Sequence, residues 1–348
     1  MFYHFYKRAV DGWLLFVFFV SNIYAGGWRL FWSDEFDSTA LKEQYWTVRV
    51  APPRWVNNEE QRYTAGHDVP NSNIFVKNGF LIIEARKTNE ITSGRIEGGG
   101  KKTFMYGRME ARMRLPKSQG YWPAFWMLGV GGGWPSCGEI DIMEGKGQQL
   151  NWTSGAFHSA QGTPVLGGNY TLPSNVGNVH DSFHIYAIEW SEDSIRWYFD
   201  KVNFMTLTKA RYPGVPINKE YYFILNVAVG GNFPGPTNSS TIFPESLIVD
   251  YVRVYKWDPA LKTENEFSKI NKSEAFISIK NSLLEINIPY NENKYVVEIY
   301  LPSGKKVFNI QLSKKFFKIP LDFLVDGLYV VKVSGKFGKQ SKKIIVQK

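Results

Sequence analysis

The chain has 348 residues, of which 44% are hydrophobic and 21% are charged, a composition that excludes a disordered or low-complexity chain. Its single cysteine, Cys137, excludes an intramolecular disulfide, so an exported form would depend on its core for stability. The net charge of +9 comes mostly from residues 259–348, which carry 16 lysines, 8 acids and no arginine. Lysines without interleaved arginines and aromatics predict a solvated surface and no nucleic-acid partner.

The first 25 residues have the layout of an export signal. Lys7 and Arg8 supply the positive region, and residues 13–20 form an apolar run too short to span a bilayer comfortably. Ala25 offers a cleavage position. We therefore expect residues 1–25 to be a signal peptide, with an uncleaved anchor or a buried first element as the alternatives. No other stretch approaches transmembrane length, which predicts a secreted or cell-surface protein without a stable membrane span.

Residues 27–257 read as a succession of short strands. The segments 79–85, 107–115 and 195–200 alternate or run apolar, and Gly, Pro and Asn separate such segments. No 3.6-residue periodicity is sustained, so the region is predicted to be all-β, a large two-sheet sandwich or jelly roll. The concave face of such a sheet suits an extended polymer, and the aromatic content of 16% suits a cleft with aromatic surfaces.

The segment 138–145, GEIDIMEG, places three acids in an apolar strand. Glu139 and Asp141 are two positions apart and share a face, whereas Glu144 would point to the opposite face of a regular strand. A β-bulge near Ile142 and Met143 would rotate Glu144 onto the face of the other two acids. Without it, one charge would enter the core, which is very costly. We therefore predict a bulge.

Crowded carboxylates repel one another, and this raises the pKa of at least one of them. Glycoside hydrolysis needs one protonated and one ionised carboxyl, and two carboxyls about 5–5.5 Å apart act with retention of configuration. Two other interpretations are solvated acids on a surface strand and a calcium site. The apolar residues between the acids disfavour the first, and calcium loops usually space their ligands on a turn.

A compositional boundary lies near residue 258, because every tryptophan and every arginine precedes it. Residues 258–272 are polar and charged and are predicted to be a linker. In residues 273–348, the short alternating segments 276–279, 295–300 and 328–333 are separated by turn signals, which predicts a second, small β-sandwich domain.

The acidic segment, preceded by Trp134-Pro135-Ser136-Cys137-Gly138, resembles the active-site signature of the laminarinase-like branch of glycoside hydrolase family 16. Further similar segments follow in the expected order and cover residues 28–257: 32–36, 57–64, 106–112, 120–128, 225–231 and 249–255. The resemblance implies a β-jelly-roll catalytic domain and retaining endo-hydrolysis of β-1,3-glucan. By position, Glu139 is then the nucleophile, Glu144 the general acid/base and Asp141 the assisting carboxylate.

The same resemblance implies substrate contacts. Trp122 and Trp126 would border the sugar subsites, since an indole ring gives a rigid platform for sugar C–H faces. Trp134 is a further stacking candidate, and Asn58 and His158 are candidates for hydrogen bonds to sugar hydroxyls. For each tryptophan the alternative is core packing, and for the histidine it is a structural role.

The resemblance implies no cofactor for catalysis but raises a structural calcium ion, which family members often hold. The matching positions are Glu35, the carbonyl of Gly79, and Asp250. Oxygen ligands suit calcium, although an acid in the Trp32–Phe36 segment could instead cap a turn.

The last 75 or so residues resemble the C-terminal sorting domains of type IX secretion, through segments 301–305, 327–333 and 342–348. The expected partners are therefore a β-glucan and the type IX secretion machinery. A carbohydrate-binding module is the alternative, but the absence of tryptophan beyond residue 257 disfavours it.

Three other functions stay open for the whole chain. A mixed-linkage β-1,3-1,4-glucanase and a marine galactan hydrolase share the family, although segment 57–61 favours glucan. A glucan-binding lectin could have the same fold without catalysis, but a binding protein has no need of three crowded carboxylates.

Overall fold

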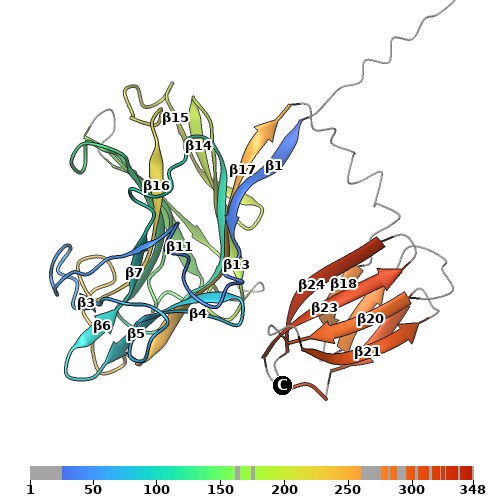
Figure 1. Cartoon of the computed structure of the whole chain (residues 1–348). Coiled ribbons are helices and arrows are strands. Elements are labelled where there is room, and N and C mark those ends of the chain that lie inside the picture. The colour runs from blue at the N-terminus through green and yellow to red at the C-terminus, as the bar shows by residue number, and fades with distance from the viewer. Residues whose placement is uncertain are drawn as a thin grey trace, which may run out of the picture.

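The computed structural model describes residues 26–160, 165–173 and 177–259, and most of 276–346 apart from 281–282, 288–294, 302–304, 313–315, 322, 326 and 336–337. The expected signal peptide, and all but the first two residues of the expected linker, lie outside the described residues. Within them the regular elements are all strands (Figure 1). No helix long and apolar enough to cross a membrane occurs in this part of the chain.

Two large sheets build the first domain. Ten strands form the first sheet: β1 (Gly27–Asp34), β3 (Arg62–Tyr63), β4 (Ile74–Lys77), β5 (Phe80–Lys87), β6 (Ile91–Ser93), β8 (Gly107–Arg114), β13 (His184–Trp190), β14 (Ser194–Phe199), β15 (Val202–Thr208) and β17 (Glu245–Asp258). Their order is β15-β14-β13-β8-β17-β5-β6-β3, and β1 pairs with β17 and β4 with β5.

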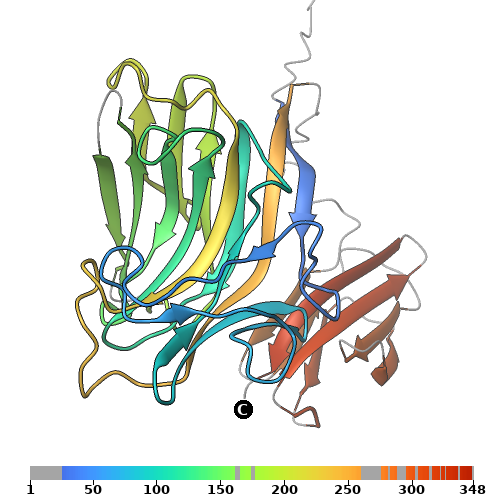
Figure 2. The ribbon, with the colours of Figure 1, turned by 60° about the vertical axis from the view of Figure 1, so that its left-hand side comes forward.

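Seven strands form the second sheet: β2 (Thr47–Val48), β7 (Arg95–Glu97), β9 (Tyr121–Gly129), β10 (Glu139–Glu144), β11 (Trp152–His158), β12 (Val165–Thr171) and β16 (Tyr221–Val229). Their order is β12-β11-β10-β9-β16-β7-β2. Figure 2 shows the long strands of the domain curving along their length. The pairing is antiparallel apart from β3 with β6, so most strands join their neighbours without helical crossovers.

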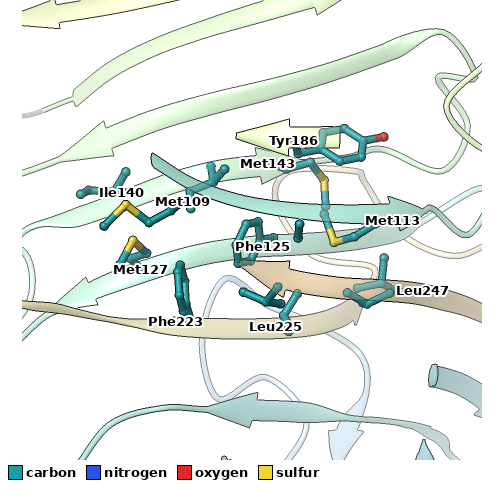
Figure 3. Packing of buried hydrophobic residues seen from close by; sticks show 14 of the residues in the cluster. Met109, Met113, Phe125, Met127, Ile140, Met143, Tyr186, Phe223, Leu225 and Leu247 are labelled. Carbon is teal, nitrogen blue, oxygen red and sulfur yellow. The ribbon is translucent and has the colours of Figure 1, made fainter. Parts of the chain in front are cut away.

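The core lies between the two sheets. Met109 and Met113 of β8 meet Phe125 and Met127 of β9, and all four are completely buried (Figure 3). Burying such a side chain stabilises the fold by about 1.5–3 kcal/mol. This packing is what the alternating sequence predicts, and the all-β sandwich prediction is confirmed.

Alternation along the second sheet also creates its outer face. In β9, Tyr121, Phe125 and Met127 point into the core, while Trp122 and Trp126 are half-buried on the other side. The second sheet therefore offers a face with aromatic side chains that the core does not use.

The C-terminal part forms two small sheets with a core of their own. Their strands are β18 (Phe276–Lys280), β19 (Leu283–Asn287), β20 (Tyr295–Tyr300), β21 (Lys306–Leu312), β22 (Phe316–Pro320), β23 (Gly327–Gly335) and β24 (Gly338–Val346). The orders are β18-β19-β22 and β21-β20-β23-β24. Leu284, Ile286, Val297, Ile299 and Val331 are fully buried in one cluster, which agrees with the predicted small β-sandwich.

Candidate active site

The β10 strand contains the predicted bulge. Asp141 pairs with Ala156 of β11, and the next matched pair is Glu144 with Ser154. Three steps along β10 thus correspond to two steps along β11, and the pairing with β9 shifts at the same place. One extra residue in β10 is the definition of a bulge, so this prediction is confirmed.

The bulge sorts the side chains of β10 between two environments. Ile142 and Met143 are consecutive, yet both are buried in the hydrophobic core. Glu144 consequently returns to the face that holds Glu139 and Asp141, and all three acids line one recess of about 90 Å³. The chain thereby avoids an unpaired carboxylate in its core.

The recess opens into a larger cleft of about 830 Å³ on the outer face of the second sheet. Aromatic and polar side chains line this cleft: Trp55, Trp122, Trp126, Trp134, Trp152, Phe233, Asn57, Arg95, His158 and Asn169. The cleft therefore combines apolar platforms with hydrogen-bonding groups, the combination that a sugar polymer needs.

Glu144 is tied to β9 by one hydrogen bond. Nε1 of Trp122 donates to its Oε1 at 3.0 Å. Burial raises the pKa of the Glu144 carboxyl, while the Trp122 hydrogen bond and the charges of His158 and Lys146 oppose that rise. A carboxyl whose pKa is raised can hold a proton near neutral pH and release it to a substrate.

Glu139 lies at the start of the strand and is largely but not fully buried, with 16% of its side-chain surface exposed. Burial raises the pKa of its carboxyl to about 8, and the negative charges of Asp141 and Glu144 add to the rise. His158 opposes the rise, with Nε2 3.7 Å from Oε1 of Glu139. Its charge state is therefore sensitive to its neighbours.

Asp141, between the two glutamates, is only 4% exposed. Burial, and after it the charge of Glu144, raises its pKa well above the usual range. Its Oδ2 lies 3.1 Å from Nε2 of His158 but accepts no hydrogen bond. A carboxyl held neutral in this place can donate its proton in a hydrogen bond to a neighbouring carboxylate.

Four of the five predicted substrate residues line the cleft: Trp122, Trp126, Trp134 and His158. Trp126 donates through Nε1 to Oδ1 of Asn226 at 2.8 Å, and Trp134 is 62% exposed. Neither Trp122 nor Trp126 belongs to the buried core.

Asn58 is placed differently. Its Nδ2 donates to Oδ1 of Asn232 at 2.9 Å in an exposed pair, and its neighbours Val56 and Asn57 line the cleft instead of it. In this arrangement the side chain of Asn58 binds another loop.

Sequence reasoning missed several cleft residues. The guanidinium carbon of Arg95 lies 4.8 Å from the ring centroid of Trp126 and 5.3 Å from that of Trp55. Phe233 lies 4.8 Å from Trp122 by ring centroids. Trp55 stands two positions before the asparagine-rich segment, which is a usable signal, but Arg95 and Phe233 reach the cleft only through folding.

Comparison with known proteins agrees with this geometry. Residues 61–239 match the family described as glycosyl hydrolases family 16. The chain belongs to this family. It is 38% identical over 248 residues to a β-glucanase of Rhodothermus marinus, covering 66% of this chain and 86% of the relative.

Solved structures give the same result. The laminarinase catalytic domain of Thermotoga maritima matches with a TM-score of 0.62 at 38% identity, covering 66% of this chain and 98% of that one. The endo-β-1,3-glucanase of Pyrococcus furiosus matches with a TM-score of 0.61 at 39% identity, covering 66% and 95%. The chain is therefore a glycoside hydrolase with the predicted jelly-roll fold.

Residues 281–347 match a secretion-system C-terminal sorting domain. This match confirms the prediction that the enzyme carries a C-terminal sorting domain for type IX secretion.

The two acids predicted as calcium ligands form ion pairs with arginines in this structure. Arg253 donates to both carboxylate oxygens of Glu35, at 2.9 and 2.8 Å, and Arg112 donates to Oδ2 of Asp250 at 2.9 Å. A guanidinium group thus binds both carboxylate oxygens of Glu35 and one of the two of Asp250, so in this arrangement both acids already have a cationic partner. The arrangement does not fit calcium, and the ion stays a prediction without geometric support.

Proposed function

We propose that this family 16 enzyme is a secreted, retaining endo-β-1,3-glucanase that acts on laminarin-type β-glucans. The observation that carries the proposal is the register shift in β10, because it gathers Glu139, Asp141 and Glu144 in one recess of an aromatic cleft. The names of the relatives with the same fold support β-glucan as the substrate class.

In the first step, the carboxylate of Glu139 attacks the anomeric carbon and forms a glycosyl ester. At the same time, the carboxylic acid of Glu144 gives its proton to the glycosidic oxygen, and the bond to the leaving chain breaks. Burial raises the pKa of Glu144, as an acid requires, but it raises the pKa of Glu139 as well, so the division of roles between them rests on the family resemblance. Burial raises the pKa of Asp141 well above the usual range, and in its protonated form Asp141 can donate a hydrogen bond to the Glu139 carboxylate, which favours the ionised nucleophile.

In the second step, the ionised Glu144 takes a proton from a water molecule, which attacks the anomeric carbon. The ester bond to Glu139 breaks, and the sugar leaves with its original configuration. Glu144 thus acts first as the acid and then as the base, while Glu139 is first the nucleophile and then the leaving group, which requires that both carboxyl groups reach the same sugar.

Retention is tested by proton NMR of early products. The β-anomer is expected to appear first and then to mutarotate; an initial α-anomer would contradict double displacement. A Glu139→Gly variant in azide should yield an α-glycosyl azide, since azide takes the place of the missing carboxylate. Absence of that product would remove Glu139 from the role of nucleophile.

Substrate class is tested by product analysis on laminarin, lichenan and agarose side by side. Laminarin is expected to be cleaved fastest, with a mixture of internal fragments appearing before glucose. Faster cleavage of lichenan would favour the mixed-linkage alternative, and faster cleavage of agarose the galactan alternative.

Export is expected to depend on the sorting domain, because its match lies in residues 281–347, outside the cleft. Deleting residues 264–348 should leave the purified enzyme active and block its secretion from a host with the type IX system. Normal secretion of the truncated enzyme would contradict this part of the proposal.

A further inference from the structure

The bulge in β10 is held at both ends by side chains that do not line the cleft. At one end, Nε1 of Trp197 donates to the backbone carbonyl of Asp141 at 2.8 Å. At the other end, Oγ1 of Thr153 donates to the backbone carbonyl of Glu144 at 3.1 Å. Trp197 is completely buried and Thr153 is 1% exposed, so neither contacts substrate.

These bonds have a physical reason. A bulge disrupts the regular ladder, and a buried carbonyl without a donor costs about 1–3 kcal/mol. Thr153 belongs to β11, the neighbouring strand, whereas Trp197 belongs to β14 in the opposite sheet. The Trp197 bond therefore crosses the core and fixes the bulge to the other layer of the sandwich.

Gly155 makes room for this bond. It lies on β11 between Ser154 and Ala156, the residues whose pairing with β10 brackets the bulge. A Cβ added to Gly155 would lie 2.4 Å from Cδ1 and 2.8 Å from Nε1 of Trp197, the atoms next to the hydrogen bond with Asp141. Real Cβ atoms essentially never come so close, so any side chain here would push the indole away from the carbonyl.

We propose that Trp197, Thr153 and Gly155 form a clamp that fixes the β10 bulge and thereby positions Glu139 and Glu144 for catalysis. They are positioning residues, and the inference rests on the catalytic roles proposed above. The expected effect is on turnover, because a misplacement of about 1 Å in the reacting groups can cost about a hundredfold in rate. The cleft aromatics are untouched, so substrate binding should change little.

The first test is Trp197→Phe, which keeps a buried aromatic ring and removes the donor. Its matched control is Trp190→Phe, because Trp190 of β13 is also buried and donates Nε1 to the carbonyl of Ile217 at 3.0 Å, outside β10, and it lines neither the recess nor the cleft. We expect kcat on laminarin to fall about 10- to 100-fold in Trp197→Phe with KM within about twofold. The control should keep kcat within about twofold at a similar loss of thermal stability.

The second test uses Thr153. Thr153→Val keeps the shape but removes the hydroxyl, and we expect kcat to fall about three- to tenfold. Thr153→Ser keeps the hydroxyl and should restore most of the turnover, which a purely packing role would not predict. If Trp197→Phe does not fold, benzothienylalanine at position 197 replaces the N–H by sulfur within the same ring shape.

Equal kcat in the Trp197→Phe and Trp190→Phe variants, or equal losses in Thr153→Val and Thr153→Ser, would overturn the clamp. The azide experiment with Glu139→Gly separates this failure from a failure of the proposed function. Azide rescue with unimpaired clamp variants would remove only the clamp, whereas no rescue would remove the catalytic assignment itself.

Discussion

Strands β8 and β10 lie in opposite sheets, and both alternate core residues with charged ones. They differ in the partners that surround their acidic side chains. In β8, Glu110 accepts a hydrogen bond from Nε of Arg108 at 2.8 Å, and further bonds from Tyr251 and Tyr255. In β10 the three acids have no arginine partner among the described residues, and burial raises the pKa of each. The structural acid Glu110 is thus held by an arginine and two tyrosines, whereas the raised pKa values of the β10 acids allow protons to be exchanged during catalysis.

The largest effect is expected when the same substitution, glutamate to glutamine, is made in each of the two strands. Glu139→Gln should lower kcat on laminarin by at least about a thousandfold, because the amide cannot attack the anomeric carbon. Glu110→Gln, the same change in β8, should keep kcat within about threefold and cost about 1–3 kcal/mol of stability. Reducing-sugar release measures the activity and thermal unfolding the stability. Comparable activity losses in the two variants would contradict the difference drawn between the acids of β8 and β10.

A smaller effect is expected from Trp122→Phe. The indole N–H favours the ionised form of Glu144, so its loss should raise the pKa of that carboxyl further. Because Glu144 acts as the acid, the alkaline limb of kcat/KM should move to higher pH, with a loss of about tenfold at the optimum. An unchanged alkaline limb, measured from pH 4 to 10, would show that this bond does not set the proton affinity of the acid.

The smallest expected effect is the change in Tm caused by replacing glutamate with glutamine. Tm should rise for the β10 variant and fall for the β8 variant. Between the ordinary carboxyl pKa of 4.5 and the value of about 8 for Glu139, the folded state binds more protons than the unfolded state. The free energy of unfolding therefore falls as pH rises through this window. Glu139→Gln removes that loss and should raise Tm on the order of 5 °C at pH 8.5, with little change at pH 4.

Glu110→Gln is the control for this stability test, since it should lower Tm instead. A Tm gain for Glu139→Gln that is the same at pH 4 and pH 8.5 would mean that the Glu139 charge is not the cause.

The bulge shows how far the sequence can predict a site. Ile142 and Met143 are adjacent apolar residues, and this break in the alternation predicts the position of the extra residue, which the pairing with β11 confirms. The same local pattern located the strands and the cleft tryptophans of β9. Local periodicity carries this information because neighbouring side chains on a strand alternate between its faces.

Other parts of the site have no local signal. Phe233 packs on Trp122 although more than a hundred positions separate them in the sequence. The expected calcium ligand Glu35 instead pairs with Arg253, a partner from the far end of the domain. Which charged groups meet depends on strand order, and the order of an antiparallel sandwich is decided by the packing of its core.

The sequence by itself determined that this chain is all-β, that one strand is bulged, and that three acids share its outer face, because each of these depends on residues within a few positions. Only the tertiary structure decided what surrounds them. Trp197 crosses from the opposite sheet to the carbonyl of Asp141, and Gly155 leaves it the space, because stacking two sheets brings together backbone and side chains that the linear order keeps apart.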